Sequence, residues 1–474
     1  MRYVKFFAVC WFASLTVLMG AGSLMAEQPP DWSGTTADTR ISFDDDSYAS
    51  YIRIAIAGDN MIHLAWSEDN PRSSPDEIHY GQSTDGGSTW SCASTDTVIS
   101  YDDNEGVNQS NDIVIDSYGY IFVVWSEDEP EPSGQNEILL TYSSDGGSTW
   151  SAVTAATDVV ISDPQQDAAS YYPGITVDPS DDLHVVYHKE DPAVGYAKIY
   201  TTRSIDGGAT WTAISTGDQM INDATSPYDD HSADIACDSS GNLFVCYKKY
   251  LGTGAGTQMY ITRSTDGGLT WSGTTAETPV STVFNIASYP RIAVDANDIV
   301  HVIWEASDET ASPYHYEIYH SRSTDGGLSW SGTSADLMIS YEQPLGDSAH
   351  NAKIAADSHG HVCVVWDEEE ETGTSNEILV SYSTDGGVTW SGSTADELIS
   401  FPDNEHGYRP DIASLASGRW IVVWSEFEGG AGAGDNYEVH LSIGDPLDPP
   451  QVPPGHWLED VPDFENEAQV EQLE

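Results

Sequence analysis

Basic residues are scarce in this sequence of 474 residues. It contains 16 Lys and Arg residues against 77 Asp and Glu residues, which gives a formal net charge of −61. A surface of this charge repels phosphate backbones and anionic lipid headgroups, so we expect no nucleic-acid partner and no electrostatic association with membranes. The chain is nevertheless 39% hydrophobic, with 15 Trp and 25 Tyr residues, which is enough for a packed core.

Long apolar runs are also rare. The sequence has one near its start, over residues 6–19, preceded by Arg2 and Lys5 and followed by a small-residue cleavage pattern at Leu24-Met25-Ala26. This pattern predicts a secretory signal peptide over residues 1–26. No later run approaches the roughly 18 residues that a membrane span needs. We therefore expect a secreted or periplasmic monomer without a membrane span.

Cysteine is the third scarce residue type. Four cysteines follow the predicted signal peptide, Cys92, Cys237, Cys246 and Cys363, each where other repeats of the chain have an apolar or small residue. The pattern predicts buried thiols. Cys237 and Cys246 fall on adjacent strands of one predicted hairpin, so a disulfide between them is permitted in an oxidising compartment, and the sequence leaves both states open.

A motif of eight residues, Ser-x-Asp-x-Gly-x-Thr-Trp, occurs in six near-perfect copies. Successive copies are separated by 59 to 61 residues, and their aspartates are Asp85, Asp145, Asp206, Asp266, Asp325 and Asp385. Such a regular period indicates one structural unit that is copied and packed against itself. Each unit contains four short alternating runs, such as 291–295, 299–304, 316–323 and 329–340 in the fifth unit, which read as strands.

Four antiparallel strands in a repeat of this length are typical of a propeller blade. Seven first strands begin near Arg53, Asp112, Gly174, Asp234, Arg291, Lys353 and Asp411. The seventh unit has no fourth strand of its own, but residues 32–42 closely resemble the fourth strand at 271–281. We therefore predict an all-β fold over residues 27–443, a seven-bladed β-propeller that is closed when the N-terminal strand pairs into the last blade.

The last 31 residues differ from the repeats. Prolines cluster at 446, 449, 450, 453 and 454, and the following residues are acidic without Lys or Arg. This composition predicts a flexible acidic, Pro-rich tail over residues 444–474.

The repeated motif is identified as the Asp-box, or bacterial neuraminidase repeat, so residues 31–443 resemble the sialidase-like β-propellers. That superfamily contains sialidases, other glycosidases and non-catalytic members. The box aspartate is expected to accept hydrogen bonds from backbone N–H groups of the turn, and the box tryptophan to pack into the blade. The resemblance also implies that ligands bind on the face opposite the boxes.

Cations break the repeat pattern on that ligand-binding face. Arg53, Arg291 and Lys353 begin first strands, and Arg409 lies two positions before another. Arginines at one inner rim can bind a carboxylate through charge-assisted hydrogen bonds. Sialidases use such a cluster for sialic acid, so the resemblance implies a ligand-binding role for Arg53, Arg291 and Arg409. Alternatively, the cations offset the acidic residues of other blades, Asp112, Asp234 and Asp411.

Two functions follow from this arrangement. In the first, the propeller binds a glycan or an extracellular protein without catalysis, and aromatic residues such as Tyr51 and Tyr289 stack on sugar rings. In the alternative, the chain is a sialidase-like exo-glycosidase that hydrolyses terminal acidic sugars. The resemblance then implies that Tyr408 is the nucleophile and Asp76 the catalytic acid.

The sequence specifies no metal site or other cofactor. Acidic clusters at 44–46, 102–105 and 368–371 offer oxygen ligands suited to Ca²⁺, but none has the spacing of a known ligand loop. These clusters are therefore either solvated acidic loops or Ca²⁺ sites, and the sequence leaves both alternatives open. The sequence has no Cys/His zinc spacing, phosphate-binding glycine loop or nucleophile elbow.

Overall fold

The computed structural model describes residues 31–447, except for the short segments 36–38, 44–46, 59–60, 70–75, 102–106, 129–134, 156–157, 165–167, 193–194, 285, 308–314, 334–335, 342–346, 370–375, 394–395, 402–405 and 428–436. Residues 30–447 form one compact unit. The predicted signal peptide and the predicted tail from residue 448 onward lie outside the described residues.

The repeats form successive sets of four antiparallel strands, numbered here by their order in each set. The first strands are β2 (Tyr48–Ala57), β6 (Val107–Ile115), β10 (Ser170–Val177), β14 (Asp230–Cys237), β18 (Ile286–Val294), β22 (Ser348–Ala356) and β26 (Gly407–Ser414). The second strands are β3 (Met61–Asp69), β7 (Ile121–Asp128), β11 (Leu183–Asp191), β15 (Leu243–Tyr250), β19 (Val300–Ser307), β23 (Val362–Glu369) and β27 (Trp420–Phe427).

The third strands are β4 (Glu77–Ser83), β8 (Asn136–Ser143), β12 (Tyr196–Ser204), β16 (Thr257–Ser264), β20 (Tyr316–Ser323), β24 (Asn376–Ser383) and β28 (Tyr437–Gly444). The outermost strands are short: β1 (Thr39–Arg40), β5 (Thr97–Val98), β9 (Val159–Val160), β13 (Gln219–Met220), β17 (Thr278–Pro279), β21 (Leu337–Met338) and β25 (Glu397–Leu398). Helical turns precede them: η1 (Ser33–Thr35), η2 (Ser91–Ala93), α1 (Ser151–Ala155), α2 (Thr212–Thr216), η3 (Ser272–Thr274), η4 (Ser331–Thr333) and η5 (Ser391–Ser393). The prediction of an all-β fold built from four-stranded antiparallel units is therefore confirmed.

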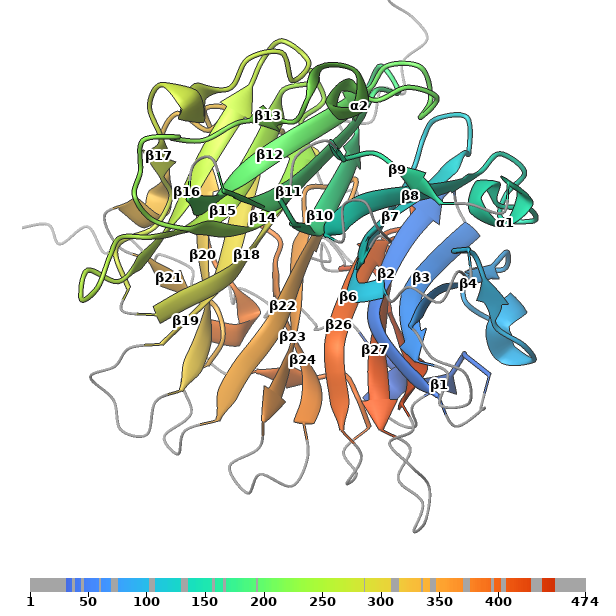
Figure 1. Ribbon diagram of the computed structural model, residues 1–474. Helices are drawn as coiled ribbons and strands as arrows, with labels where there is room; N and C mark the ends of the chain where they lie inside the picture. Colours follow the sequence, from blue (N-terminus) through green and yellow to red (C-terminus); the bar gives the residue numbers. More distant parts are fainter. Residues whose placement is uncertain are drawn as a thin grey trace, which may run out of the picture. The chain divides into compact units, whose positions relative to one another are not determined.

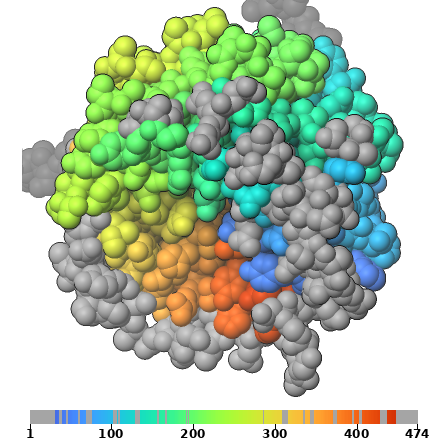
Figure 2. Space-filling model, in the orientation of Figure 1, coloured from blue at the N-terminus to red at the C-terminus, as the bar shows by residue number. Residues whose placement is uncertain are grey.

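The strands form five four-stranded sheets and one eight-stranded sheet. The larger sheet contains β26-β27-β28 with β1, followed by β2-β3-β4-β5, and the two halves meet where Tyr48 pairs in parallel with Tyr437. Strand β1 runs antiparallel to β28, with Thr39 opposite Leu441 and Arg40 opposite His440. The N-terminal strand thus lies in the same sheet as the last third strand. Figure 2 shows early and late parts of the described chain, in blue and orange-red, next to each other on the visible face.

First strands lie next to one another in sequence order, and β26 also contacts β2. Figure 1 shows them in the middle of this unit, with the second and third strands outside them. Between the sheets lie apolar clusters that contain the fully buried tryptophans of the second strands, Trp66, Trp125, Trp304, Trp366 and Trp424. The arrangement places the start of every first strand around one central space.

Two repeats replace the buried tryptophan by tyrosine. In four of the other five second strands a tryptophan donates its indole N–H to a glutamate two positions later, as Trp66 does to Glu68 at 2.6 Å. In β11 the corresponding residues are Tyr187 and Lys189, and both bind the carboxylate of Asp218. Tyr247 and Lys249 of β15 bind Glu277 in the same way. These lysines are therefore structural, since each has a buried acidic partner.

The Asp-boxes fasten the turns between third and fourth strands, as predicted. In the third box, Asp206 accepts the backbone N–H of Thr210 at 2.8 Å and its hydroxyl at 2.7 Å, and the indole N–H of Trp211 is donated to the Gly208 carbonyl. The arginine before a box ties neighbouring repeats together: Arg203, Arg263 and Arg322 donate to box glycine carbonyls of the next repeat, at Gly267, Gly326 and Gly386.

The four cysteines within the described residues are free thiols, and Cys92, Cys246 and Cys363 are buried, as predicted. Cys237 is half-buried, and the strand register places it opposite Leu243, whereas Cys246 lies opposite Asp234. The hairpin register therefore separates the two thiols for which the sequence permitted a disulfide.

Candidate functional site

A β-bulge interrupts the first strands near their start and turns the backbone into the left-handed region. Six non-glycine residues adopt φ of 50° to 56° there: Tyr51, Tyr172, Ser232, Tyr289, Asn351 and Arg409. This conformation costs roughly 1–2 kcal/mol for a residue with a Cβ. Strained residues of this kind concentrate where a protein must display particular side chains.

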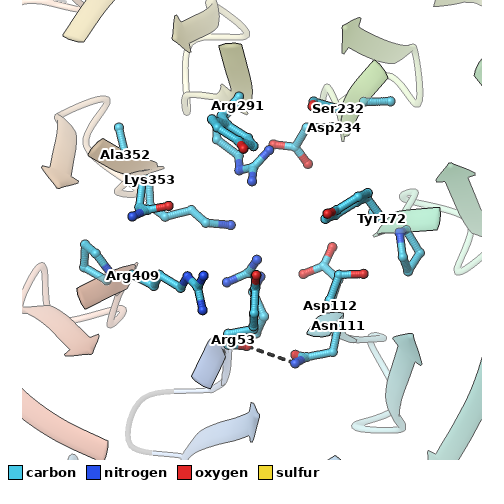
Figure 3. Close-up of a pocket in the computed structure, with 18 residues that line it drawn as sticks. Arg53, Asn111, Asp112, Tyr172, Ser232, Asp234, Arg291, Ala352, Lys353 and Arg409 are labelled. Carbon is cyan, nitrogen blue, oxygen red and sulfur yellow. Dashed lines mark hydrogen bonds between the residues drawn. The ribbon is translucent and has the colours of Figure 1, made fainter. Parts of the chain in front are cut away.

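These strained residues line one cavity of about 160 Å³. Six first strands also contribute the residue two positions further along: Arg53, Asp112, Gly174, Asp234, Arg291 and Lys353. The residue at this position of β26, Asp411, is not among the lining residues. Two rings therefore surround the cavity, an outer one of strained residues and an inner one of mostly charged residues. Figure 3 shows side chains from different sheets pointing into this common space.

The acidic members of the inner ring are held by backbone groups. Each of these aspartates, and Asp411 at the same position of β26, accepts an N–H from its own strand and one from the first strand of the next repeat: Asp112 from Ile113 at 3.0 Å and Ile175 at 2.9 Å, Asp234 from Ile235 at 3.0 Å and Ile292 at 3.0 Å, and Asp411 from Ile412 at 3.0 Å and Ile54 at 3.1 Å. These carboxylates thus link neighbouring first strands, which is an architectural role.

The cations of the cavity have weaker protein partners. Arg53 donates to the Ile52 carbonyl at 2.8 Å, and Arg291 donates to the Pro290 carbonyl at 3.0 Å. Among the described residues, neither arginine, nor Lys353 or Arg409, forms a salt bridge within 4.0 Å. Figure 3 shows Arg53, Arg291, Lys353 and Arg409 extended toward the middle of the cavity, so their donors remain available to a ligand.

Burial and mutual repulsion shift the titration of this ring. Burial, with the nearby charges of Arg53 and Arg291, lowers the pKa of Lys353 to about 7. Burial raises the pKa of Asp112 to about 6, although Arg53 opposes that shift. The charge of the cavity therefore changes between about pH 6 and pH 7, and it becomes more positive as the pH falls.

Two buried carboxylates of the second strands hold strained residues in place. Asp367 accepts the backbone N–H of Arg409 and the side-chain amide of Asn351, each at 2.9 Å. Glu305 accepts the backbone N–H of Asn351 at 2.6 Å and lies 3.2 Å from Nδ1 of His350. The sequence analysis missed these supports. The available signal was an acid where other second strands have Ser67, Ser126 and Ser425.

Aromatic side chains form part of the rim. Tyr172 and Tyr289 are about half exposed, at 50% and 49%. The buried ring of His188 stacks on Tyr171 and Tyr172, with centroids 5.6 and 5.5 Å apart. Burial lowers the pKa of His188 to about 3, so this imidazole is neutral at physiological pH. The rim thus offers uncharged, partly apolar surfaces beside the cations.

The seven residues singled out in the sequence fall into two groups. Those suggested for ligand binding, Tyr51, Arg53, Tyr289, Arg291 and Arg409, line the same cavity.

The two suggested for catalysis are not among its lining residues. Asp76 precedes β4, and its carbonyl accepts the N–H of Val107 at 3.1 Å. Tyr408 lies beside His406 and Tyr437, with ring centroids at 5.8 and 6.0 Å. Burial, followed by nearby acids, raises the pKa of Tyr408. Of the acidic clusters considered for calcium, 44–46 and 102–105 and residues 370–371 of the cluster 368–371 lie outside the described residues. Glu368, which is described, accepts the indole N–H of Trp366 at 2.9 Å.

The repeated sheets and Asp-boxes define a β-propeller of the sialidase-like superfamily. A family model described as "BNR repeat-like domain" matches residues 122–370, and the chain belongs to this family. No curated protein matches the sequence significantly. Within the described residues, no helix is long and apolar enough to cross a membrane.

Solved structures share the fold at low sequence identity. A polysaccharide lyase described as ulvan lyase is 12% identical, with 86% of this chain and 96% of that chain covered and a TM-score of 0.59. A second structure of an ulvan lyase, bound to -[GlcA(1-4)Rha3S]-, has the same identity and coverage and a TM-score of 0.58. The Hadza microbial sialidase Hz136 is 16% identical, with 67% and 63% covered and a TM-score of 0.44. At 12% identity, the likeness to the two ulvan lyase structures concerns the fold alone.

Proposed function

We propose that this chain is an exported propeller that binds a glycan through an anionic group, a carboxylate or a sulfate, in the central cavity, without turnover. One observation carries the proposal: four of the 16 Lys and Arg residues of a chain with a net charge of −61 line a single cavity. Elsewhere in the described chain, basic residues such as Lys189, Lys198 and Arg203 have structural partners.

The surroundings of these cations favour a sugar as the carrier of the anion. Tyr172 and Tyr289 present half-exposed rings beside the guanidinium groups, and aromatic faces are suited to the apolar faces of sugar rings. The cavity volume of about 160 Å³ is below the roughly 300–1,000 Å³ of sites for drug-sized ligands, which favours a terminal sugar over a long segment. The saccharide bound in the second ulvan lyase structure, -[GlcA(1-4)Rha3S]-, offers a suitable probe.

Binding without turnover is favoured over the exo-glycosidase alternative. Catalysis at the cavity requires an acid and a nucleophile or base within reach of the bound sugar. Asp76 and Tyr408 are not among the lining residues, and Asp112 and Asp234 are occupied by backbone N–H groups.

The test is calorimetric titration with glucuronate-containing, sulfated and neutral oligosaccharides of equal length. We expect acidic ligands to bind and neutral ones to bind weakly or not at all. Removal of a charge-assisted contact costs about 1.5–3 kcal/mol, so Arg53→Ala and Arg291→Ala should each weaken binding roughly 10- to 100-fold. Arg419→Ala, an exposed cation outside the cavity, is the matched control.

Equal affinity for neutral and acidic ligands, or unchanged affinity in both arginine variants, contradicts the proposal. A parallel assay with a fluorogenic sialoside between pH 4 and pH 8 tests the alternative function. Product release that is lost in Arg53→Ala would favour the exo-glycosidase.

We also propose that the sheets form seven blades closed by the N-terminal strand. The eight-stranded sheet contains two four-stranded sets, and the other five sheets contain one each, which supports seven. Closure is supported by the pairing of β1 with β28, by the buried ring of Trp32 against Gly444, and by the Gly34 N–H donated to Ser442 at 2.9 Å.

Trp32→Ala should lower the free energy of unfolding by about 3–5 kcal/mol, as loss of a large buried side chain does. The control Thr39→Ala, at an exposed position of β1 in the same N-terminal segment, should leave it within about 0.5 kcal/mol. A Trp32→Ala variant as stable as the control contradicts closure by this segment.

A further inference from the structure

The turn between β22 and β23 carries two histidines and an aspartate outside the cavity. Asp357 Oδ2 lies 2.8 Å from Nδ1 of His361 and 3.5 Å from Nδ1 of His359. The three ligand atoms all lie within 4.8 Å of one another. We propose that these three residues bind a divalent transition metal ion of the Zn²⁺ or Cu²⁺ class.

Comparison between repeats shows which residues of this turn recur in other repeats and which occur here alone among the five turns compared. Five turns between first and second strands begin with an aspartate that accepts two backbone N–H groups: Asp116, Asp178, Asp238, Asp295 and Asp357. The aspartate is therefore a turn residue. Of these five turns, that of Asp357 carries histidine both two and four positions later. The turns 116–120, Asp-Ser-Tyr-Gly-Tyr, and 238–242, Asp-Ser-Ser-Gly-Asn, share its aspartate, serine and glycine but have no histidine.

The carboxylate is oriented for a metal by the turn itself. Asp357 Oδ1 accepts the N–H of His359 at 2.8 Å and that of His361 at 2.9 Å. The other oxygen, Oδ2, is thereby directed at the two imidazoles. Outer hydrogen bonds that fix a ligand in this way are typical of metal sites and raise their affinity.

The distances fit a tetrahedral ion. Metal–ligand bonds of about 2.0–2.2 Å place neighbouring ligand atoms roughly 3.3–3.6 Å apart, and the two Asp357–His separations of 2.8 and 3.5 Å lie close to that range. The imidazole rings are nearly parallel, with centroids 5.8 Å apart and an angle of 21° between the planes. Small side-chain rotations are enough to bring both nitrogens onto one ion.

The donor set selects the kind of metal. Two imidazole nitrogens and one carboxylate oxygen suit Zn²⁺ and Cu²⁺, whereas Ca²⁺ and Mg²⁺ prefer oxygen ligands only. His361 and Asp357 are mostly buried, but the His359 side chain is 61% exposed, so the fourth position of a tetrahedral ion faces solvent. Water or a residue of a bound partner can complete the site there.

The experiment is titration of the full chain with Zn²⁺ in the presence of excess Ca²⁺, which saturates acidic surface sites. We expect one tight equivalent, which weakens at least about 100-fold in His359→Ala and in His361→Ala, because loss of a ligand costs more than loss of an outer contact. Ser358→Ala, in the same turn, and Asn242→Ala, at the matching position of the 238–242 turn, are controls that should keep it.

Electron paramagnetic resonance of the Cu²⁺-loaded chain gives a second readout, since imidazole nitrogens produce hyperfine structure that should be lost in the histidine variants. Circular dichroism verifies that the variants are folded. A wild-type chain without a tight equivalent, or histidine variants that bind Zn²⁺ as the Ser358→Ala control does, overturns the proposal. Ligand binding in the central cavity is measured separately, so failure here leaves the proposed function unaffected.

Discussion

The guanidinium carbon of Arg409 lies 4.0 Å from the centroid of the Tyr51 ring. The two residues belong to β26 and β2, the last and the first of the first strands, and both have a left-handed backbone, with φ of 52° and 53°. A strained arginine is thus stacked on a strained tyrosine across the boundary between two repeats. The contact orients the Arg409 head group at the edge of the cavity.

A double-mutant cycle should detect this contact. We expect a coupling of about 0.5–1 kcal/mol between Tyr51 and Arg409 in the free energy of unfolding, measured with Tyr51→Leu and Arg409→Met. Tyr51→Phe keeps the aromatic face and should keep the coupling. A coupling of zero within error for the wild-type pair would mean that the stacking contributes nothing to stability.

Glycine should be more stabilising than alanine at a strained position. Tyr289 has φ of 50° and is 49% exposed, so little packing is lost on substitution. We expect Tyr289→Gly to be more stable than Tyr289→Ala by about 1 kcal/mol, because glycine has no Cβ to clash. At Tyr142, a strand position without positive φ, the order should reverse. Urea unfolding of the four variants checks both signs.

The affinity for an anionic ligand should fall as the pH rises from about 5.5 to 8. Above its pKa of about 7, Lys353 loses its positive charge, and above its pKa of about 6, Asp112 gains a negative charge. Both changes oppose anion binding. Lys353→Arg keeps the charge and should remove the step near pH 7. An affinity that is independent of pH, or that rises with pH, contradicts the assigned roles.

Acid should weaken the Asp-boxes. Hydrogen bonds from Thr270 lower the pKa of Asp266 to about 2, and those from Ser329 do the same for Asp325. A carboxylate with a lowered pKa stabilises the fold above about pH 4, its unfolded value, and that contribution is lost as the pH falls toward 2. Urea midpoints between pH 5 and pH 2.5 should therefore fall less steeply in Asp266→Asn than in the wild type. Equal slopes would show that the box carboxylate does not contribute.

Removal of one partner of the buried ion pair Lys189–Asp218 should destabilise the fold more than replacement of both partners. Both side chains are fully buried. Lys189→Met leaves a buried carboxylate without its cation, which should destabilise the fold by about 3–5 kcal/mol. The double variant Lys189→Met/Asp218→Asn should recover part of this loss. The exposed control Arg419→Ala should change stability by less than about 0.5 kcal/mol.

Repetition made the fold readable from sequence. The spacing of the boxes fixes which residues occupy the same place in each repeat, so Arg53, Arg291 and Lys353 could be placed at one level of a common rim before any coordinates. That these three side chains lie close together could therefore be predicted without knowing the conformation of the loops. The same comparison groups Arg203 with Arg263 and Arg322, which also precede boxes and donate to the next repeat in the same way.

The strained ring could not be read in this way. Positive φ is expected of glycine, but Tyr172, Tyr289 and Arg409 adopt it directly before proline, where an extended backbone is the ordinary expectation. Tyr408 and Arg409 also show that a position in a family motif does not determine where the side chain at that position points. Successive residues of a strand point to opposite sides, and here a bulge intervenes, so one lines the cavity and its neighbour does not.

Thr39 pairs with Leu441, so the N-terminal strand has no partner until nearly the whole chain has been synthesised. At about 5–20 residues per second, translation of the intervening chain takes tens of seconds, and β1 has no pairing partner during this time. Until it pairs with β1, the last third strand, β28, carries an open edge that can recruit other polypeptides. The nascent chain is therefore most vulnerable to aggregation just before its two distant ends meet.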